Sequence, residues 1–151
     1  MLKRVVATGT FDILHPGHLY YLEESKKFGD ELHVIVARDE NVRHKPKPVI
    51  PEGQRLRMVN ALKPVDFARL GDLIDMYRPI EEINPTVITL GFNQHFDEDR
   101  LRRELGERGL YPEVVRIGSF AGERFCSSRI IVSQVLERYS GKGTGAKFVP
   151  E

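Results

Sequence analysis

The chain has 151 residues, of which 40% are hydrophobic and 30% charged, and its formal net charge is +1. This length and composition predict a globular fold with a sizeable core, and the small net charge argues against binding nucleic acid or a membrane surface through bulk charge. The single cysteine, Cys126, allows no internal disulfide and fits a reducing compartment. No apolar run reaches the roughly 20 residues of a membrane span, and no signal-peptide segment precedes the first predicted strand. We therefore expect a cytoplasmic protein.

The first 37 residues have the pattern of a strand, a helix and a second strand. Residues 4–9 form a continuous apolar run, which is typical of a parallel strand covered on both faces. A helix is predicted over residues 16–28, because Pro16 suits a first helical position, where its missing N–H would have no partner. Residues 32–37 are rich in valine and isoleucine and predict a second strand parallel to the first.

The alternation of strand and helix continues along the chain. In a helix predicted over residues 75–83, Met76, Ile80 and Ile83 share one face. The remaining strands are predicted at 65–70, 86–90 and 113–117, and the remaining helices begin at Pro51, near Asp97 and at Ser127 or Ser128. This order predicts a Rossmann-like α/β fold, a doubly wound parallel five-stranded sheet in a three-layer α/β/α sandwich. We expect one domain over residues 1–139 and a flexible tail over 140–151.

The stretch His15-Pro16-Gly17-His18 is the main candidate for a functional site. Two histidines three residues apart lie on one face of the first turn of the predicted helix. The free backbone N–H groups and the positive dipole end at that turn favour an anion. Gly9 and Gly17 lack side chains where a ligand would touch the backbone, so the residues describe a phosphate-sized site flanked by two imidazoles.

Polar segments follow the first, second and fourth predicted strands, at residues 9–18, 38–47 and 91–94. Ligands of such sheets bind beyond the carboxyl ends of the strands, where the strand order reverses. We therefore expect these segments to border one crevice, together with the serines that open the last helix.

Two separated motifs resemble the signatures of the cytidylyltransferase-like nucleotidyltransferases. The first is Gly9-Thr10-Phe11-Asp12 followed by His15-Pro16-Gly17-His18, and the second is Ser127-Ser128-Arg129-Ile130. The resemblance runs from residue 1 to about residue 139. When residues 34–40 are included, the sequence most resembles the archaeal FAD synthases, a family of FMN adenylyltransferases. The resemblance implies transfer of AMP from ATP to FMN by direct in-line attack, with release of pyrophosphate and no covalent enzyme intermediate.

The resemblance also implies roles for particular residues. His15 and His18 would donate hydrogen bonds to the α- and β-phosphates as negative charge develops, and Lys45 or Lys47 would clamp the triphosphate or the acceptor phosphate. The catalytic residues implied are His15, His18 and Lys45. The nucleotide-binding residues implied are Thr10, Phe11, His15, His18, Asn93, Ser127 and Ser128, and those for the acceptor phosphate are Asp12, Lys45 and Arg55. Mg²⁺ is expected to accompany the triphosphate with few protein ligands, and relatives of this size imply a homodimer.

Other interpretations stay open at the level of sequence. The acceptor could instead be a small phosphate monoester such as glycerol 3-phosphate or pantetheine phosphate, with CTP or ATP as donor, or the chain could bind nucleotide without catalysis. A flavin ring needs an apolar slot, for which Phe92, Phe96 and Phe120 are candidate walls. Zinc binding by the histidine pair is disfavoured, because no cysteine or third histidine lies nearby at ligand spacing. Each of these residues also has a purely structural interpretation. Lys45 and Lys47 could be solvated surface charges, and Arg55 could form a surface ion pair with Glu52. Asn93 and Gln94 could be turn residues, and Ser127 or Ser128 could only cap the last helix.

Overall fold

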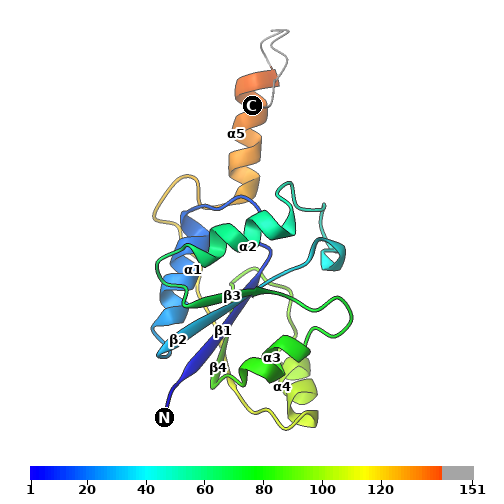
Figure 1. Ribbon diagram of the computed structural model, residues 1–151. Coiled ribbons are helices and arrows are strands. Elements are labelled where there is room, and N and C mark those ends of the chain that lie inside the picture. The colour runs from blue at the N-terminus through cyan, green and yellow to red at the C-terminus, as the bar shows by residue number, and fades with distance from the viewer. Residues whose placement is uncertain (141–151) are drawn as a thin grey trace.

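In the computed structural model, which describes residues 1–140, five parallel strands form one sheet in the order β3-β2-β1-β4-β5 (Figure 1). The strands are β1 (Arg4–Gly9), β2 (Glu31–Val36), β3 (Phe67–Leu70), β4 (Val87–Leu90) and β5 (Glu113–Arg116). The helices are α1 (Pro16–Lys26), the 3₁₀ turn η1 (Asp39–Asn41), α2 (Glu52–Asn60), α3 (Arg78–Ile83), α4 (Glu98–Glu107) and α5 (Ser128–Ser140). The predicted strand and helix order is confirmed, with ends that differ by a few residues.

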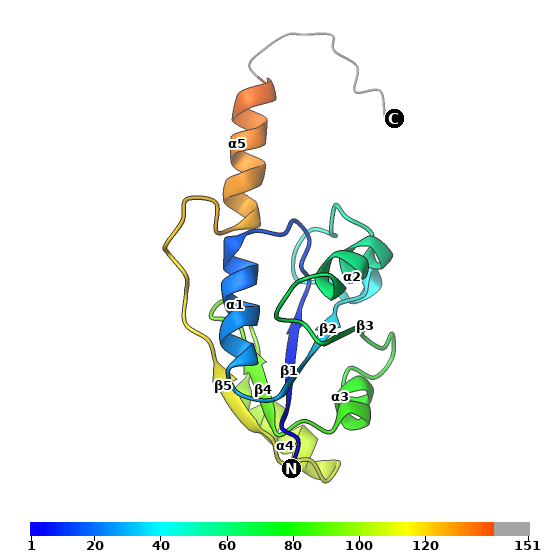
Figure 2. The same ribbon diagram turned by 60° about the vertical axis from the view of Figure 1, so that its left-hand side comes forward.

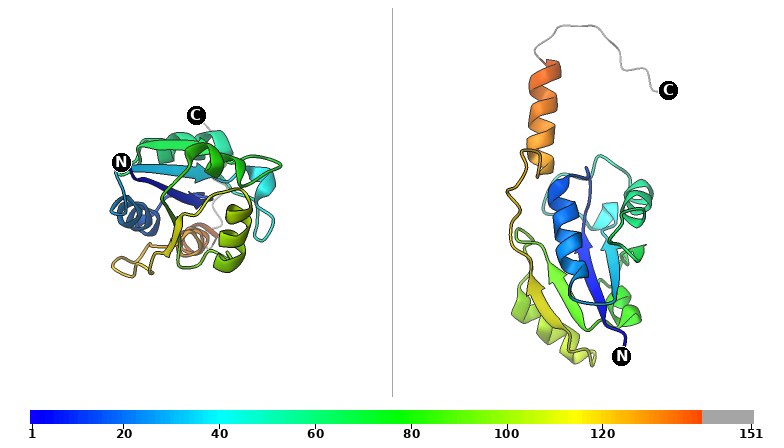
Figure 3. Two further views of the ribbon diagram at one scale, coloured as in Figure 1. Left: turned by 90° about the horizontal axis from the view of Figure 1, so that it is seen from below. Right: turned by 90° about the vertical axis from the view of Figure 1, so that its left-hand side faces the viewer.

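The sheet is the centre of the core because its inner strands are apolar on both faces. Val5, Val6 and Ala7 in β1 have no exposed surface. One face of the sheet packs against α1 and α2 through residues such as Leu22 and Val59, and the other packs against α3 and α4 through residues such as Ile80 and Leu105 (Figure 3). The predicted three-layer, doubly wound arrangement is therefore confirmed.

The strand register brings the carboxyl ends of the strands to one edge. Gly9 pairs with Val36, Val36 with Leu70, and Leu90 with Arg116. The strand order reverses between β1 and β4, which are neighbours in the sheet. A ligand site is thus expected above these two strands, where the loops after β1 and β4 separate.

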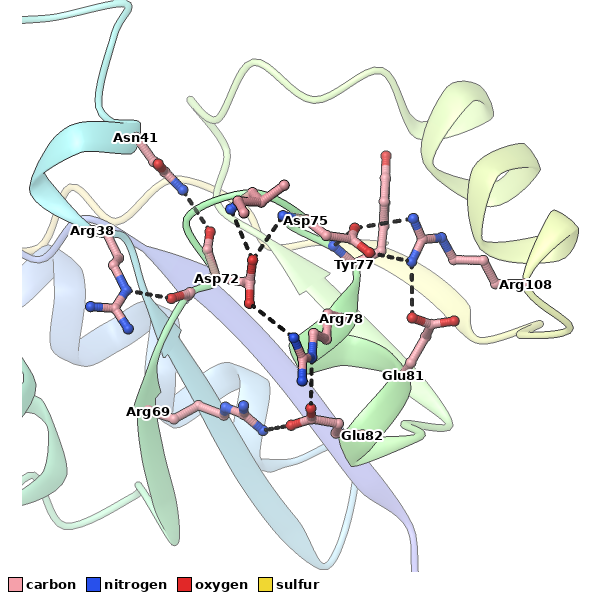
Figure 4. Close-up of polar contacts among 12 residues, drawn as sticks. Arg38, Asn41, Arg69, Asp72, Asp75, Tyr77, Arg78, Glu81, Glu82 and Arg108 are labelled. Carbon is pink, nitrogen blue, oxygen red and sulfur yellow. Dashed lines mark hydrogen bonds and ion pairs between the residues drawn. The ribbon is translucent and has the colours of Figure 1, made fainter.

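The helix predicted over residues 75–83 begins only at Arg78. Asp72 accepts hydrogen bonds from the backbone N–H groups of Ile74 at 2.9 Å and Asp75 at 2.8 Å, which folds the preceding segment into turns. Asp75 in turn pairs with Arg108 of the segment after α4 at 2.8 Å (Figure 4). The expectation that Met76 shares the core face was wrong, since this side chain is 45% exposed. Local polar side chains compete successfully with the helix here.

Helix α5 projects away from the sheet and its covering helices (Figures 1 and 2). None of its residues is buried. Its apolar side chains gather along one stripe, formed by Ile131, Val132, Val135, Leu136 and Tyr139. Residues 141–151, which include most of the predicted flexible tail, lie outside the described residues. No helix within residues 1–140 is long and apolar enough to cross a membrane.

Candidate active site

The two histidines lie at the start of α1, where the sequence predicts them. His15 is the N-cap residue, and its Nδ1 accepts a hydrogen bond from the backbone N–H of His18 at 3.3 Å. The two imidazole rings stack with centroids 3.7 Å apart and an interplanar angle of 23°. Because Nδ1 of His15 is an acceptor, its neutral ring carries the proton on Nε2. The capping bond therefore fixes His15 as an Nε2–H donor.

Burial and neighbouring charge keep both rings neutral near pH 7. Burial, followed by the nearby His15 and Lys45, lowers the pKa of His18 to about 3. Burial also lowers the pKa of His15. Within residues 1–140, Nδ1 of His18 is buried without a hydrogen-bond partner. The pair can thus donate neutral N–H groups to an anion, and neither ring is suited to act as a resident cation.

The glycines of the first motif serve packing, which corrects the expectation that they leave room for a ligand. A Cβ on Gly9 would lie 2.7 Å from the ring of Phe11, which is 2% exposed. Phe11 has a φ of 53°, a left-handed conformation, and its ring lies against Gly9 with its centroid 5.3 Å from that of the His18 ring. A Cβ on Gly17 would lie 2.5 Å from the carbonyl oxygen of Cys126. The glycines therefore allow close contact within the protein.

The second motif meets the first at the tips of two helices. The carbonyl oxygen of Ser127 accepts the N–H of Ile131 at 3.2 Å, so Ser127 occupies the N-cap position of α5. Ser128 donates its hydroxyl to the carbonyl oxygen of Ile13 at 3.5 Å, just before His15. Figure 2 shows the first turn of α5 above the first turn of α1. Two helix N-termini face one another here, and both favour a bound anion.

Asp12 is a tether for the lysine-bearing loop in this structure. Its carboxylate accepts the backbone N–H groups of Val49 at 2.9 Å and Ile50 at 2.8 Å. These bonds tie the end of the loop that carries Lys45 to the turn before His15. This geometry does not support the predicted contact of Asp12 with the acceptor phosphate, because both carboxylate oxygens already accept protein hydrogen bonds.

Arg55 lies inside the protein. The residue is 1% exposed, and its guanidinium donates to the carbonyl oxygens of Ile50 at 2.8 Å and Thr10 at 2.6 Å and to the Asp39 carboxylate at 2.6 Å. The Arg55 hydrogen bond lowers the pKa of Asp39. The predicted phosphate contact is not supported here either, because every guanidinium nitrogen already binds the protein. Arg55 instead joins the ends of β1 and β2 to the start of α2.

The two loop lysines differ in their surroundings. The charge of Lys45 lies close enough to His18 to contribute to its lowered pKa. Lys47 donates to the carbonyl oxygen of Asp39 at 2.7 Å. Lys45 is thus the better candidate for a phosphate clamp.

The loop after β4 is held against β1. The side-chain amide of Gln94 accepts the N–H of Gly91 at 2.7 Å and donates to the carbonyl oxygen of Thr8 at 2.8 Å. This arrangement leaves Asn93 exposed at the same edge as His15. The sequence predicted Gln94 to border the crevice as part of residues 91–94, with a turn residue as the alternative. It did not predict this contact, because the partner Thr8 is far away in the sequence.

The three phenylalanines considered as walls of a flavin slot separate in the structure. Phe92 is 57% exposed, Phe96 packs against the α3–α4 core, and Phe120 stacks on Tyr20 at 4.9 Å between ring centroids. A pocket of about 620 Å³ lies instead between the turn before His15 and α2. Its lining is mainly apolar and consists of Phe11, Asp12, Ile13, Leu14, Ile50, Gln54, Arg55, Arg57 and Met58.

A strand-order switch, two facing helix N-termini and a neutral histidine pair thus lie together at one edge of the sheet. The profile of the cytidylyltransferase-like family matches residues 6–140. The chain belongs to the cytidylyltransferase-like family.

Known proteins similar to this chain include curated FAD synthases. That of Methanolacinia petrolearia is 69% identical over 137 residues, which cover 91% of this chain and 93% of the relative. That of Methanoculleus marisnigri is 71% identical over 128 residues, which cover 85% and 86% of the two chains. A solved structure, described as a lipopolysaccharide core biosynthesis protein from Thermoplasma volcanium, has a TM-score of 0.77 and 46% identity. The alignment covers 80% of this chain and 100% of the solved chain.

Proposed function

We propose that this chain is an FMN adenylyltransferase that transfers AMP from ATP to FMN and releases FAD and pyrophosphate. The observation that carries the proposal is the similarity to curated FAD synthases, at 69% and 71% identity over most of both chains. The pocket of about 620 Å³ supports a large acceptor, since it is within the size range of pockets for drug-sized ligands and has an apolar lining.

The proposed chemistry is a direct in-line displacement. A phosphate oxygen of FMN attacks the α-phosphorus of ATP, a new P–O bond forms, and the bond between the α-phosphorus and the bridging oxygen breaks as pyrophosphate leaves. Catalysis of such a transfer consists mainly of positioning and charge stabilisation. His15 through Nε2–H, His18 and Lys45 would stabilise the charge that develops on the phosphate oxygens. Thr10 and Phe11 would hold phosphate through their backbone.

Ser127 and Ser128, at the N-terminus of α5, would bind the β- and γ-phosphates, and Asn93 would contact the nucleoside. A divalent cation, which we propose to be Mg²⁺, would neutralise part of the triphosphate charge. Within residues 1–140 no group of three acidic, histidine or cysteine side chains could hold a metal ion.

We also propose that the chain is cytoplasmic and forms a homodimer. The exposed apolar stripe of α5 supports a homodimer, because a surface helix with such a stripe is stabilised by packing. Light scattering of the purified protein should give twice the mass of one chain, and the mass of a monomer would contradict this proposal.

The proposed function is tested by a pyrophosphate-release screen of ATP, CTP and GTP against FMN, glycerol 3-phosphate and pantetheine phosphate. We expect turnover with ATP and FMN, and chromatography should show FAD as the product. Turnover of CTP with glycerol 3-phosphate while FMN is left untouched would refute it. Nucleotide binding without turnover of any pair would favour a binding module.

A further inference from the structure

The loop between β4 and α4 has to be rigid if Asn93 is to recognise a nucleoside. The loop has no regular secondary structure, and Asn93 itself is exposed. Gln94 fixes the β1 side of the loop through Thr8. A second contact, on the side of β5, binds three backbone carbonyl groups of the loop.

That second contact is Arg116, the last residue of β5. Its Nη1 donates to the carbonyl oxygens of Gly91 and Gln94, both at 2.9 Å, and its Nη2 donates to that of Phe96 at 3.2 Å. Its Nε donates to the carboxylate of Glu98 at the start of α4, also at 2.9 Å. One side chain therefore holds both ends and the middle of the loop that displays Asn93.

The geometry requires an arginine. A guanidinium presents its N–H donors in a fixed planar fork, whereas a lysine ammonium is a point charge on a flexible stem. The register that pairs Leu90 with Arg116 places this fork beside the point where the chain leaves β4. Because the guanidinium donor is positively charged, these hydrogen bonds are stronger than bonds between neutral groups. The side chain is about one-third exposed, so solvent screens part of this gain.

We propose that Arg116 is a positioning residue for nucleotide recognition, which holds the β4–α4 loop so that Asn93 meets the nucleoside of the bound triphosphate. Arg116 acts through the loop and does not itself touch the reacting atoms. This inference rests on the proposed function, which supplies both ATP as the nucleotide and the contact of Asn93 with the nucleoside. It predicts that the affinity for nucleotide depends on Arg116 more than the affinity for FMN does.

The chain offers a matched control. Arg102 also pairs with Glu98, at 3.6 Å, but binds no part of residues 91–96. Arg102→Gln therefore removes an arginine and a Glu98 ion pair and leaves the loop contacts in place. Arg116→Gln removes the loop contacts as well, and Arg116→Lys keeps the charge without the fork.

The experiment measures KM for ATP and for FMN in these variants, together with calorimetric binding of a non-hydrolysable ATP analogue. Arg116→Gln should weaken nucleotide binding about tenfold, the equivalent of 1.4 kcal/mol, with KM for FMN within about twofold of the wild type. Arg116→Lys should restore only part of the affinity, and Arg102→Gln should leave it unchanged. Thermal unfolding of each variant establishes that it is folded.

A double-mutant cycle with Asn93→Ala separates positioning from a general structural role. If Arg116 acts through Asn93, the loss caused by Asn93→Ala should largely disappear in the Arg116→Gln background. Additive losses, equal changes in both KM values or unchanged nucleotide affinity would overturn the inference. The analogue-binding measurement needs no acceptor, so it decides the role of Arg116 even if FMN is not the substrate.

Discussion

At the scale of single residues, the His15–His18 pair determines what the site can do. The capping hydrogen bond fixes the proton of His15 on Nε2, and burial with nearby positive charge keeps His18 neutral. A neutral N–H donor requires no change of protonation state when it binds a phosphate oxygen. In the proposed function, the pair can stabilise developing charge without a prior change of protonation state.

Substitution of His18 should lower the rate of the chemical step more than substrate binding. We expect His18→Asn to reduce kcat about 100-fold or more, because a preorganised donor to a transition-state oxygen is commonly worth that much. His33→Asn, in β2 beside Glu31 and outside the loops of the site, is the control and should leave kcat unchanged. Steady-state kinetics with ATP and FMN measure both. A rise in KM alone would show that His18 contributes only to binding.

The lowered pKa of His18 also predicts a pH dependence of stability. The unfolded chain binds a proton at His18 near pH 6.5, whereas the folded chain binds it only near pH 3. The unfolded state therefore holds more protons between these values, and the free energy of unfolding falls as the pH drops. The slope is at most about 1.4 kcal/mol per pH unit for this residue.

Urea unfolding between pH 4.5 and 7.5 measures this effect above the range in which the aspartates titrate. The wild type should lose stability below pH 6.5, and His18→Asn should show a flatter profile. An identical slope in the two proteins would mean that His18 does not titrate abnormally.

At the scale of elements, the segment between β2 and α2 is positioned by its contacts with the turn after β1. Asp12 accepts two backbone N–H groups near the end of this segment, and Lys47, just before them, donates to the Asp39 carbonyl oxygen at its start. Lys45 lies between Asp39 and Lys47, in the part of the segment that this second bond closes. This arrangement makes the position of Lys45 dependent on Asp12.

Asp12→Ala should therefore lower kcat/KM by displacing Lys45. We expect a decrease of about tenfold and a loss of about 1 kcal/mol of stability, because two backbone hydrogen bonds are lost in a loop where water can replace the carboxylate. In a Lys45→Ala background the further effect of Asp12→Ala on kcat/KM should be small. Full additivity of the two effects would instead give Asp12 a separate role in the reaction.

At the scale of the whole molecule, Arg55 links three parts of the fold. Its buried guanidinium binds the end of β1, the segment after β2 and the start of α2, and the exposed Asp39 carboxylate completes the pair. The loss of a partner from such a buried network leaves other polar groups without hydrogen bonds. The loop architecture around the site therefore depends on one internal charge.

Arg55→Met should destabilise the protein by about 1–3 kcal/mol, because the carbonyl oxygens of Ile50 and Thr10 lose their charged donor, whereas the partly exposed Asp39 carboxylate can be hydrated. Arg57→Met, two residues further along α2 at an exposed position, provides the control and should change stability little. Denaturant unfolding of both variants measures the difference. If Arg55→Met were as stable as the control, the hydrogen-bond network would contribute little to folding.

The sequence by itself determined the strand and helix order, the parallel sheet, the start of α1 at Pro16 and the pairing of His15 with His18. These features follow from local regularities: apolar runs, helical spacing and residues that suit a helix end. The start of the helix near Arg78 escaped prediction because Asp72 and Asp75 form turns with their own neighbours. The apolar spacing of residues 76–83 is the same whether these turns form or a helix does, so the spacing could not reveal the later start.

Only the tertiary structure decided what Asp12, Arg55, Gln94 and Arg116 do. The partners of these side chains lie far away in the sequence, as between Asp12 and Ile50 or between Gln94 and Thr8. A charged residue in a loop has the same local pattern whether it binds a ligand or another loop. Whether such a residue binds a ligand or another loop depends on the tertiary structure. The parallel strands bring their carboxyl ends to one edge, and there each polar side chain binds the nearest backbone carbonyl or N–H group.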